Sequence, residues 1–103
     1  MKSDLKVILW TAEWCAPCQA LKRSKTLEKA IQTLAVKGFG LATLESRDVD
    51  AKQWSDESDS QDVQAMPTID LIRKGKRLAR TVGASTERTF VSKWVKALEQ
   101  TQR

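Results

Sequence analysis

The chain contains two cysteines, Cys15 and Cys18, in the five-residue run WCAPC at positions 14–18. Three uses are open to such a pair: a structural disulfide, two of the ligands of a zinc ion, or a redox-active dithiol. A structural disulfide would close a loop too short to remove much entropy from the unfolded chain. A tetrahedral zinc site needs four ligands, and the sequence offers only these two thiols. The spacing therefore favours the redox dithiol, and the other two uses stay open.

Histidine is absent from the 103 residues, which excludes several other chemistries. Without an imidazole the chain has no Ser-His-Asp or Cys-His nucleophile system and no histidine general base. The net charge of +5 is too small on its own to predict nucleic-acid binding.

A strand and a helix are expected to position the two cysteines. Residues 6–11 predict a buried strand, because the run 7–10 is apolar and rich in β-branched and aromatic side chains. After the connection 12–14, small or apolar residues recur at steps of three and four, as on one face of a helix that ends near Gly38. They are Ala20, Leu21, Ser24, Leu27, Ile31 and Leu34. This pattern places Cys15 at the helix N-terminus and Cys18 one turn inside, with Pro17 in the first turn.

Such a position explains how the pair would react. The unpaired N–H groups and the positive end of the helix stabilise an anion, so a Cys15 thiolate is favoured. Cys15 would attack a substrate disulfide, and the more buried Cys18 would then attack Cys15 and release the reduced substrate.

The rest of the chain predicts three further strands, at 39–44, 68–72 and 77–82, and two further helices. The first is a short helix at 51–58 and the second is capped by Ser85 or Thr86, with a buried face formed by Phe90, Val91, Trp94, Val95 and Leu98. The turn between the last two strands is Lys74-Gly75. The order β-α-β-α-β-β-α predicts one α/β domain over residues 1–103, with a four-stranded mixed sheet flanked by helices.

The sequence also bears on location. No apolar run approaches the roughly 20 residues that span a bilayer, and the run 7–10 is too short for the hydrophobic region of a signal peptide. We therefore expect a cytoplasmic protein that makes no membrane contact.

Four segments together resemble the thioredoxin family, over about residues 7–98. They are AEWCAPC at 12–18, Met-Pro-Thr at 66–68, the Lys74-Gly75 turn, and Val-Gly-Ala at 82–84. The resemblance implies a thioredoxin-like fold and the reduction of protein disulfides by Cys15 and Cys18, with no metal and no cofactor beyond the redox-active disulfide. Thioredoxin reductase or the glutathione system would return the electrons.

The resemblance also assigns a substrate groove. Pro67 matches the family's cis-proline, which lies against the dithiol, and the backbone of Met66 would pair with an extended substrate segment. The other residues expected to line the groove are Trp14, Ala16, Pro17, Val82, Gly83 and Ala84.

The chain departs from the family pattern at several positions. Ala16 replaces the usual glycine, Arg23 replaces a helix proline, and most of the N-terminal strand and helix of the family is missing. The family's buried aspartate, six residues before the first cysteine, falls on Leu9, and its lysine partner falls near Ser46. We expect Cys18 to be harder to deprotonate as a result, unless water or Glu13 accepts its proton.

Two features stay open. Arg73, Lys74, Lys76, Arg77 and Arg80 form a basic hairpin, which is either a solvated edge or a docking patch for an acidic protein; the lack of interleaved aromatic residues makes nucleic acid unlikely. Trp54 either covers the core or is an exposed contact residue. Glutaredoxin-like, isomerase or oxidant activity is an alternative function, and so is a non-catalytic docking module of the same fold.

Overall fold

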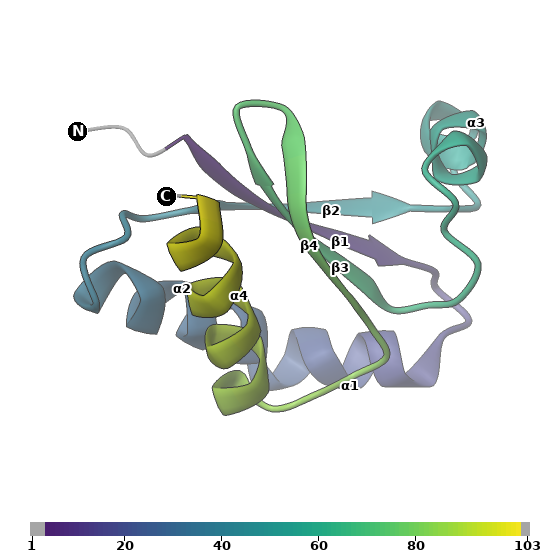
Figure 1. The fold of residues 1–103 in the computed structure, drawn as a ribbon. Helices are drawn as coiled ribbons and strands as arrows, with labels where there is room; N and C mark the ends of the chain where they lie inside the picture. The colour runs from purple at the N-terminus through teal and green to yellow at the C-terminus, as the bar shows by residue number, and fades with distance from the viewer. Residues whose placement is uncertain (1–3, 102–103) are drawn as a thin grey trace.

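A computed structural model describes residues 4–101 of the chain. Four strands form one mixed sheet in the order β2-β1-β3-β4, with β1 parallel to β2 and the other neighbours antiparallel (Figure 1). The strands are β1 (Leu5–Thr11), β2 (Thr43–Asp48), β3 (Thr68–Arg73) and β4 (Lys76–Val82). The helices are α1 (Ala16–Ser24), α2 (Thr26–Val36), α3 (Lys52–Ser60) and α4 (Glu87–Thr101). The predicted α/β fold class is confirmed.

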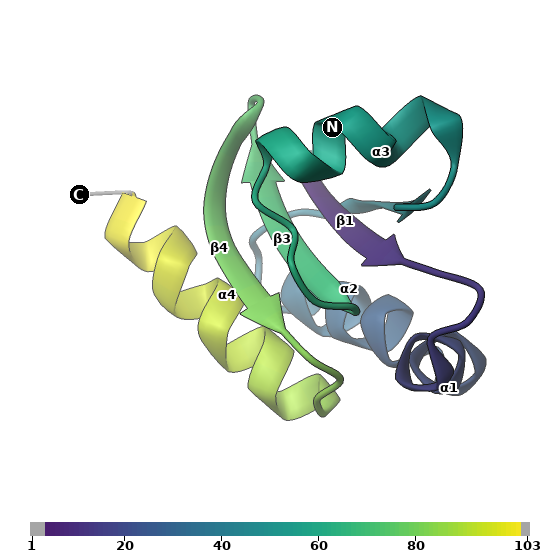
Figure 2. The same cartoon turned by 90° about the vertical axis from the view of Figure 1, so that its right-hand side faces the viewer.

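The sheet separates two unequal layers. Figure 2 shows α2 and α4 on one side of the sheet and α3 on the other. The main hydrophobic core lies on the α2 and α4 side, where alternate residues of β1 and β3 meet the helices. The strands contribute Val7, Leu9, Ile69 and Leu71, and α4 contributes Phe90, Trp94 and Leu98. The rings of Phe90 and Trp94 stack with their centroids 5.8 Å apart. This core holds β1 in place, and the cysteines follow directly after β1 in the chain.

The first predicted helix is in fact two helices, so that expectation was wrong in one respect. Lys25 takes a left-handed conformation, with φ 57°, and its N–H bonds to the carbonyl of Lys22 at 3.2 Å, which ends α1. The break changes the phase of the apolar pattern. Ala20 and Ser24 are therefore exposed rather than buried, while α2 buries Leu27, Ala30, Ile31 and Leu34.

The second predicted strand was placed too early. Residues 39–44 were expected, but β2 covers Thr43–Asp48. The apolar residues before it lie in a loop, where Ala42 is buried and Phe39 packs against the core. β2 itself buries no residue, because it is an edge strand. Its polar side chains gave no apolar signal to read.

The later elements lie close to their predicted positions. Lys74 and Gly75 form the hairpin turn with φ values of 50° and 78°, the combination that suits a tight β-hairpin. Thr86 rather than Ser85 caps α4, because its Oγ1 accepts a hydrogen bond from the Thr89 N–H at 3.2 Å. None of the helices in residues 4–101 is long and apolar enough to cross a membrane.

Candidate functional site

The two cysteines stand where β1 gives way to α1, and they are joined as a disulfide. Cys15 is the N-cap residue of α1, and its Sγ accepts a hydrogen bond from the backbone N–H of Cys18 at 3.3 Å. Pro17 occupies the first turn, where a helix needs no N–H. The local sequence therefore puts one sulfur atom at the positive end of a helix and directly on an orphan N–H donor.

The surroundings of the two sulfur atoms are apolar. Cys15 is 4% exposed and Cys18 is fully buried, in a small cluster with Ala12 against which Val49 and Met66 pack. For Cys15 the helix terminus and the Cys18 N–H favour the thiolate in the reduced state. Cys18 sits one turn deeper in α1 and is fully buried. The two sulfur atoms thus differ in position, with Cys15 at the helix terminus and Cys18 inside the first turn.

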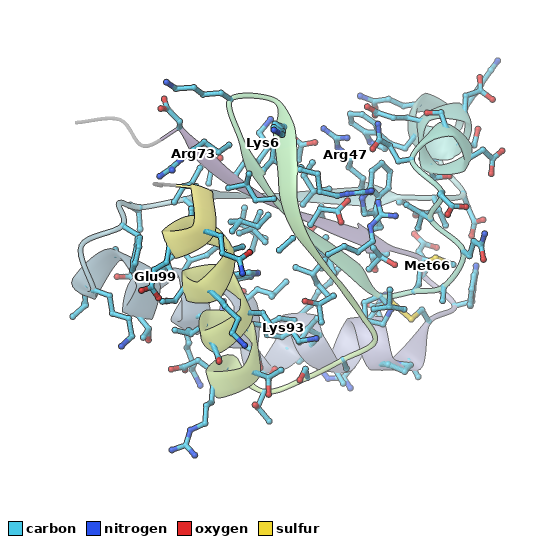
Figure 3. The ribbon with its side chains drawn as sticks, in the orientation of Figure 1. Lys6, Arg47, Met66, Arg73, Lys93 and Glu99 are labelled. Carbon is cyan, nitrogen blue, oxygen red and sulfur yellow. A yellow bond between two sulfur atoms is a disulfide. The ribbon has the colours of Figure 1, made fainter. Side chains whose placement is uncertain are left out.

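A second segment, far away in sequence, meets the cysteines. The Met66–Pro67 peptide bond is cis, and the side chain of Met66 packs against the cysteine cluster. In Figure 3 the labelled Met66 lies at the same end of the molecule as the disulfide. The carbonyl of Pro67 accepts a hydrogen bond from the Gly83 N–H at 2.7 Å, which brings the segment 82–84 alongside.

The Met66 backbone is left without a hydrogen bond to any residue in the described range 4–101. Four of the expected groove residues are exposed and are called the rim below: Trp14, Ala16, Pro17 and Val82. Trp14 is 67% and Val82 is 61% exposed, and Ala16 and Pro17 are exposed beside them. Of the residues that the resemblance assigned to the groove, the structure packs Met66 against Cys15 and Cys18 and joins Gly83 to Pro67.

One contact of the rim escaped the sequence analysis. The indole Nε1 of Trp14 donates a hydrogen bond to Asp50 Oδ2 at 2.6 Å, and the Asp50 N–H bonds to Asp48 Oδ1 at 2.9 Å. Asp50 therefore fixes the orientation of the exposed Trp14 ring. No local pattern in the sequence points to this pair, because the two residues lie 36 positions apart.

Leu9 and Ser46, which depart from the family pattern, lie on adjacent strands. Leu9 is 2% exposed in the main core, and Ser46 is its register partner on β2. Leu9 and Ser46 therefore occupy neighbouring strands, as a carboxylate and its lysine partner would. Glu13 is exposed to solvent.

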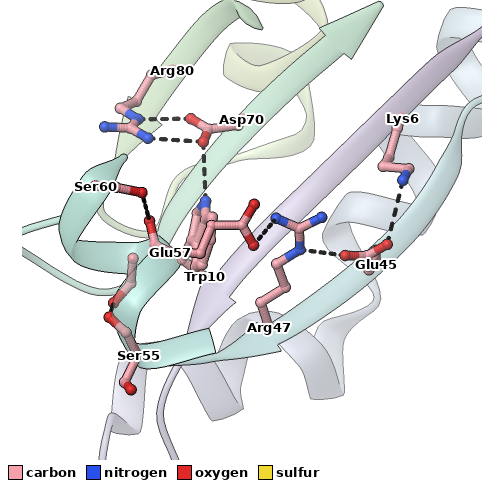
Figure 4. A network of polar contacts seen from close by, with 10 residues as sticks. Lys6, Trp10, Glu45, Arg47, Ser55, Glu57, Ser60, Asp70 and Arg80 are labelled. Atoms are coloured by element: carbon pink, nitrogen blue, oxygen red, sulfur yellow. Dashed lines mark hydrogen bonds and ion pairs between the residues drawn. The ribbon is translucent and has the colours of Figure 1, made fainter. Parts of the chain in front are cut away.

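The opposite face of the sheet carries a polar network instead of a second apolar core (Figure 4). Arg47 lies over the rings of Trp10 and Trp54, with its guanidinium carbon 5.2 Å and 4.3 Å from the two ring centroids. It also pairs with Glu45 and Glu57. The hydrogen bond from Arg47, helped by the nearby charge of Lys6, lowers the pKa of Glu45 below its usual value. Trp54, left undecided by the sequence, covers this arginine.

The basic hairpin needs one correction. Arg80 was counted among its surface charges, but its guanidinium is bound to the buried carboxylate of Asp70, with Nε 2.7 Å from Oδ1 and Nη2 2.9 Å from Oδ2. The hydrogen bonds that Arg80 donates to Asp70 raise the pKa of Arg80. The basic hairpin tip therefore consists of Arg73, Lys74, Lys76 and Arg77.

A pair of cysteines at the junction of a strand and a helix, packed against the Met66–Pro67 segment, defines a thioredoxin-like dithiol site. Comparisons with known proteins place the chain in the same family. The sequence model of the thioredoxin family matches residues 1–97, so the chain belongs to the thioredoxin family. Among residues 4–101, no three His, Cys, Asp or Glu side chains gather as a metal-binding group.

Named relatives are similar over most of the chain. Thioredoxin H2-2 of Oryza sativa subsp. japonica is 36% identical over 90 residues, which cover 82% of this chain and 57% of that protein. Thioredoxin-1 of Drosophila melanogaster is 32% identical over 95 residues, covering 90% of this chain and 81% of that one. The structure of oxidized mitochondrial thioredoxin 3 from Saccharomyces cerevisiae superposes with a TM-score of 0.69 at 30% identity, covering 91% and 78% of the two chains. The chain thus spans little more than half the length of the rice relative.

Proposed function

We propose that this protein is a thiol–disulfide oxidoreductase that reduces disulfide bonds in other proteins. The observation that carries the proposal is the Cys15–Cys18 pair at the N-terminus of α1, facing the Met66–Pro67 segment. The pair needs no metal and no further cofactor, because the two thiols themselves hold the two electrons.

The reaction has two exchange steps. The Cys15 thiolate attacks one sulfur of a substrate disulfide; that S–S bond breaks, a substrate thiolate leaves, and a mixed disulfide with Cys15 forms. The Cys18 thiolate then attacks Cys15 Sγ, and the second substrate thiolate leaves. The substrate gains two electrons and two protons, and the Cys15–Cys18 pair becomes the disulfide. A thioredoxin reductase or the glutathione system would supply the electrons that restore the dithiol.

The groove supports the binding part of the proposal. The Met66 backbone, which has no hydrogen-bond partner in the described residues, would add an extended substrate segment as a short strand. The exposed side chains of Trp14 and Val82 would contact that segment on its two sides. The buried Pro67 at the floor would keep the substrate sulfur close to Cys15.

The test uses three cysteine variants and a disulfide-bridged peptide as substrate. Cys15→Ser is expected to lower the reduction rate by on the order of 10³ or more, because it removes the nucleophile. Cys18→Ser is expected to accumulate a mixed disulfide with the peptide that mass spectrometry detects. A double variant, Cys15→Ser/Cys18→Ser, that keeps the cellular role of the protein would contradict the proposal and favour a docking module.

We also propose an acidic protein partner for the basic hairpin tip. Its four cations lie at the end of the sheet away from the disulfide, as the positions of Arg73 and Met66 in Figure 3 show. A partner could therefore bind there without covering the groove. Replacing Arg73, Lys74 and Lys76 by Gln should weaken capture of an acidic protein and leave peptide reduction unchanged. Equal capture by the variant would leave a solvated edge as the only role of these charges.

We place this activity in the cytoplasm, because a reducing compartment keeps the pair in the dithiol form that donates electrons. One relative, Thioredoxin-2 of Schizosaccharomyces pombe, is named as mitochondrial. Imaging of a fluorescent fusion decides the point, and a signal confined to mitochondria would contradict it.

A further inference from the structure

The segment 61–67 connects α3 to β3 and ends at the cis Met66–Pro67 bond. Little apolar packing holds its first half, because the helix before it, α3, buries only Ser58. Asp62 follows the C-cap of α3 in a left-handed conformation, with φ 59°, which turns the chain away from the helix. Backbone hydrogen bonds to α3 tie its first residues, since the N–H groups of Gln61 and Val63 donate to the carbonyls of Glu57 and Ser58, both at 2.9 Å. The rest of the segment needs anchors on the sheet to keep one conformation.

Arg80 on β4 supplies such an anchor. Its Nη1 donates to the carbonyl of Gln61 at 2.8 Å and to the carbonyl of Asp62 at 3.3 Å. The remaining donors of the same guanidinium bind both oxygens of Asp70. One planar group therefore joins the sheet to the beginning of the segment, a geometry that an ammonium group does not provide.

Asp70 holds Arg80 in this orientation. It lies opposite Arg80 in the β3–β4 register and is only 2% exposed. Its Oδ2 also accepts a hydrogen bond from Trp10 Nε1 on β1, at 3.0 Å (Figure 4). The carboxylate thus accepts three donors from two neighbouring strands, and a buried charge with such partners is rigidly placed.

The anchored segment borders the substrate groove directly. A cleft of about 340 Å³ is lined by Asp62, Gln64, Ala65, Thr68, Arg80 and Val82. Val82 belongs to the rim of the groove, and Ala65 immediately precedes Met66. Downstream, Thr68 Oγ1 bonds to the Ala65 carbonyl at 2.6 Å. The segment is therefore tied at its start by α3 and Arg80, and at its end by β3.

We propose that Arg80, oriented by Asp70 and Trp10, is a positioning residue that holds segment 61–67 in the conformation that binds the substrate. This inference rests on the proposed function and deepens it: Arg80 governs the affinity for the disulfide substrate, and the reactivity of Cys15 does not depend on it. Arg80 is far from the sulfur atoms in the sequence and acts through the backbone of 61–67 alone.

The test compares variants that keep the sheet intact. Arg80→Leu alone would leave Asp70 buried without its main partner and destabilise the fold. The double variant Asp70→Leu/Arg80→Leu removes the whole ion pair, and a buried pair replaced by apolar side chains is often tolerated. Arg80→Lys keeps the positive charge but loses the planar guanidinium that binds Asp70 and the backbone carbonyls at the same time. Arg88→Leu, a change at an exposed cation on α4, is the matched control.

Two readouts separate this role from a merely structural one. For the disulfide-bridged peptide, we expect both Arg80 variants to raise KM about tenfold, which is the scale of one lost charge-assisted hydrogen bond. We expect kcat to stay within about twofold of the wild type. The rate at which iodoacetamide alkylates Cys15 should also stay within about twofold. Amide hydrogen exchange should become faster at 62–66 and stay slow in α2 and α4. The control should match the wild type in both.

Several outcomes would overturn the inference: an unchanged KM, a fall in kcat and alkylation instead of a rise in KM, or equal exchange at 62–66. Exchange is measured on the protein without substrate, so it decides the anchoring role even if the wild type fails to reduce the peptide. That failure would refute the proposed function by itself.

Discussion

Leu9 is the single residue that most sets this site apart from the family pattern. It fills a buried position of β1 with an apolar side chain, and the resemblance places the family's buried aspartate at this position. Leu9→Asp should therefore speed the second exchange step near neutral pH, because it supplies an acceptor for the proton of Cys18. The measurement is the decay of a preformed mixed disulfide between Cys15 and a peptide.

The same substitution has a cost in stability. A buried carboxylate without a partner is expected to lower the free energy of unfolding by several kcal/mol. Leu9→Asn is the matched control, since it is polar and similar in size but accepts no proton. If the mixed disulfide decays at the same rate in folded Leu9→Asp as in the wild type, proton uptake does not limit the step.

Glu45 gives a prediction for the pH dependence of stability. Arg47 lowers the pKa of Glu45 below 4.5 in the folded state. A depressed pKa means that Glu45 stabilises the fold above its unfolded pKa and that this contribution disappears as the pH falls through the folded value. Chemical denaturation between pH 6 and pH 3 should therefore show a shallower loss of stability in Glu45→Gln. The difference will be small, because the Glu45 side chain is 33% exposed and solvent screens the pair. Parallel curves for the two proteins would contradict it.

The sequence pattern pointed to the cysteine segment and the Met-Pro-Thr segment, but not to the polar residues that hold the surrounding structure in place. WCAPC and Met-Pro-Thr are local signals, and in the structure Met66 packs against Cys15 and Cys18. Asp50, Asp70 and Arg80 gave no such signal, because their partners lie 36, 60 or 10 positions away. Arg80 in particular looked like one more charge of a basic hairpin, and only the register of β3 and β4 shows the carboxylate opposite it.

At the scale of elements, the break between α1 and α2 is set by one residue. Lys25 occupies a left-handed conformation that favours glycine. Lys25→Val should lower the free energy of unfolding by about 1–2 kcal/mol, because a β-branched side chain fits this conformation poorly. Lys25→Gly should not destabilise the protein. Lys29→Val, an exposed helical control on α2, should cost only about 0.5 kcal/mol. Equal losses at positions 25 and 29 in urea denaturation would show that the break is not strained.

The two misplaced elements have a shared physical cause. Apolar periodicity reports which residues are buried. Both errors arose where a residue's burial does not reveal its secondary structure. β2 is a strand without buried residues, and positions 20 and 24 belong to a helix whose phase changes at Lys25. The elements that bury a continuous face, β1, β3 and α4, were predicted within one or two residues.

At the scale of the whole molecule, the two proposed surfaces lie at opposite ends of the sheet. The disulfide and Met66 occupy one end, and Arg73 of the hairpin tip lies at the other (Figure 3). Between them, the face under α3 is held by ion pairs and stacked arginine instead of a second apolar core. Element order predicted the four-stranded mixed sheet, because parallel strands joined by helices leave few arrangements. It did not predict the polar face, which depends on contacts between distant strands.

The most direct test of the account is the reduction potential of the Cys15–Cys18 pair. The protein would be equilibrated in buffers of defined thiol–disulfide ratio and followed by tryptophan fluorescence, to which Trp14 beside Cys15 contributes. A protein-disulfide reductase should show a reversible two-electron couple near the value of about −270 mV that is typical of thioredoxins. A value of about −200 mV or higher would point to isomerase, oxidant or glutaredoxin-like work. That value, or the absence of a reversible couple, would contradict the proposed function.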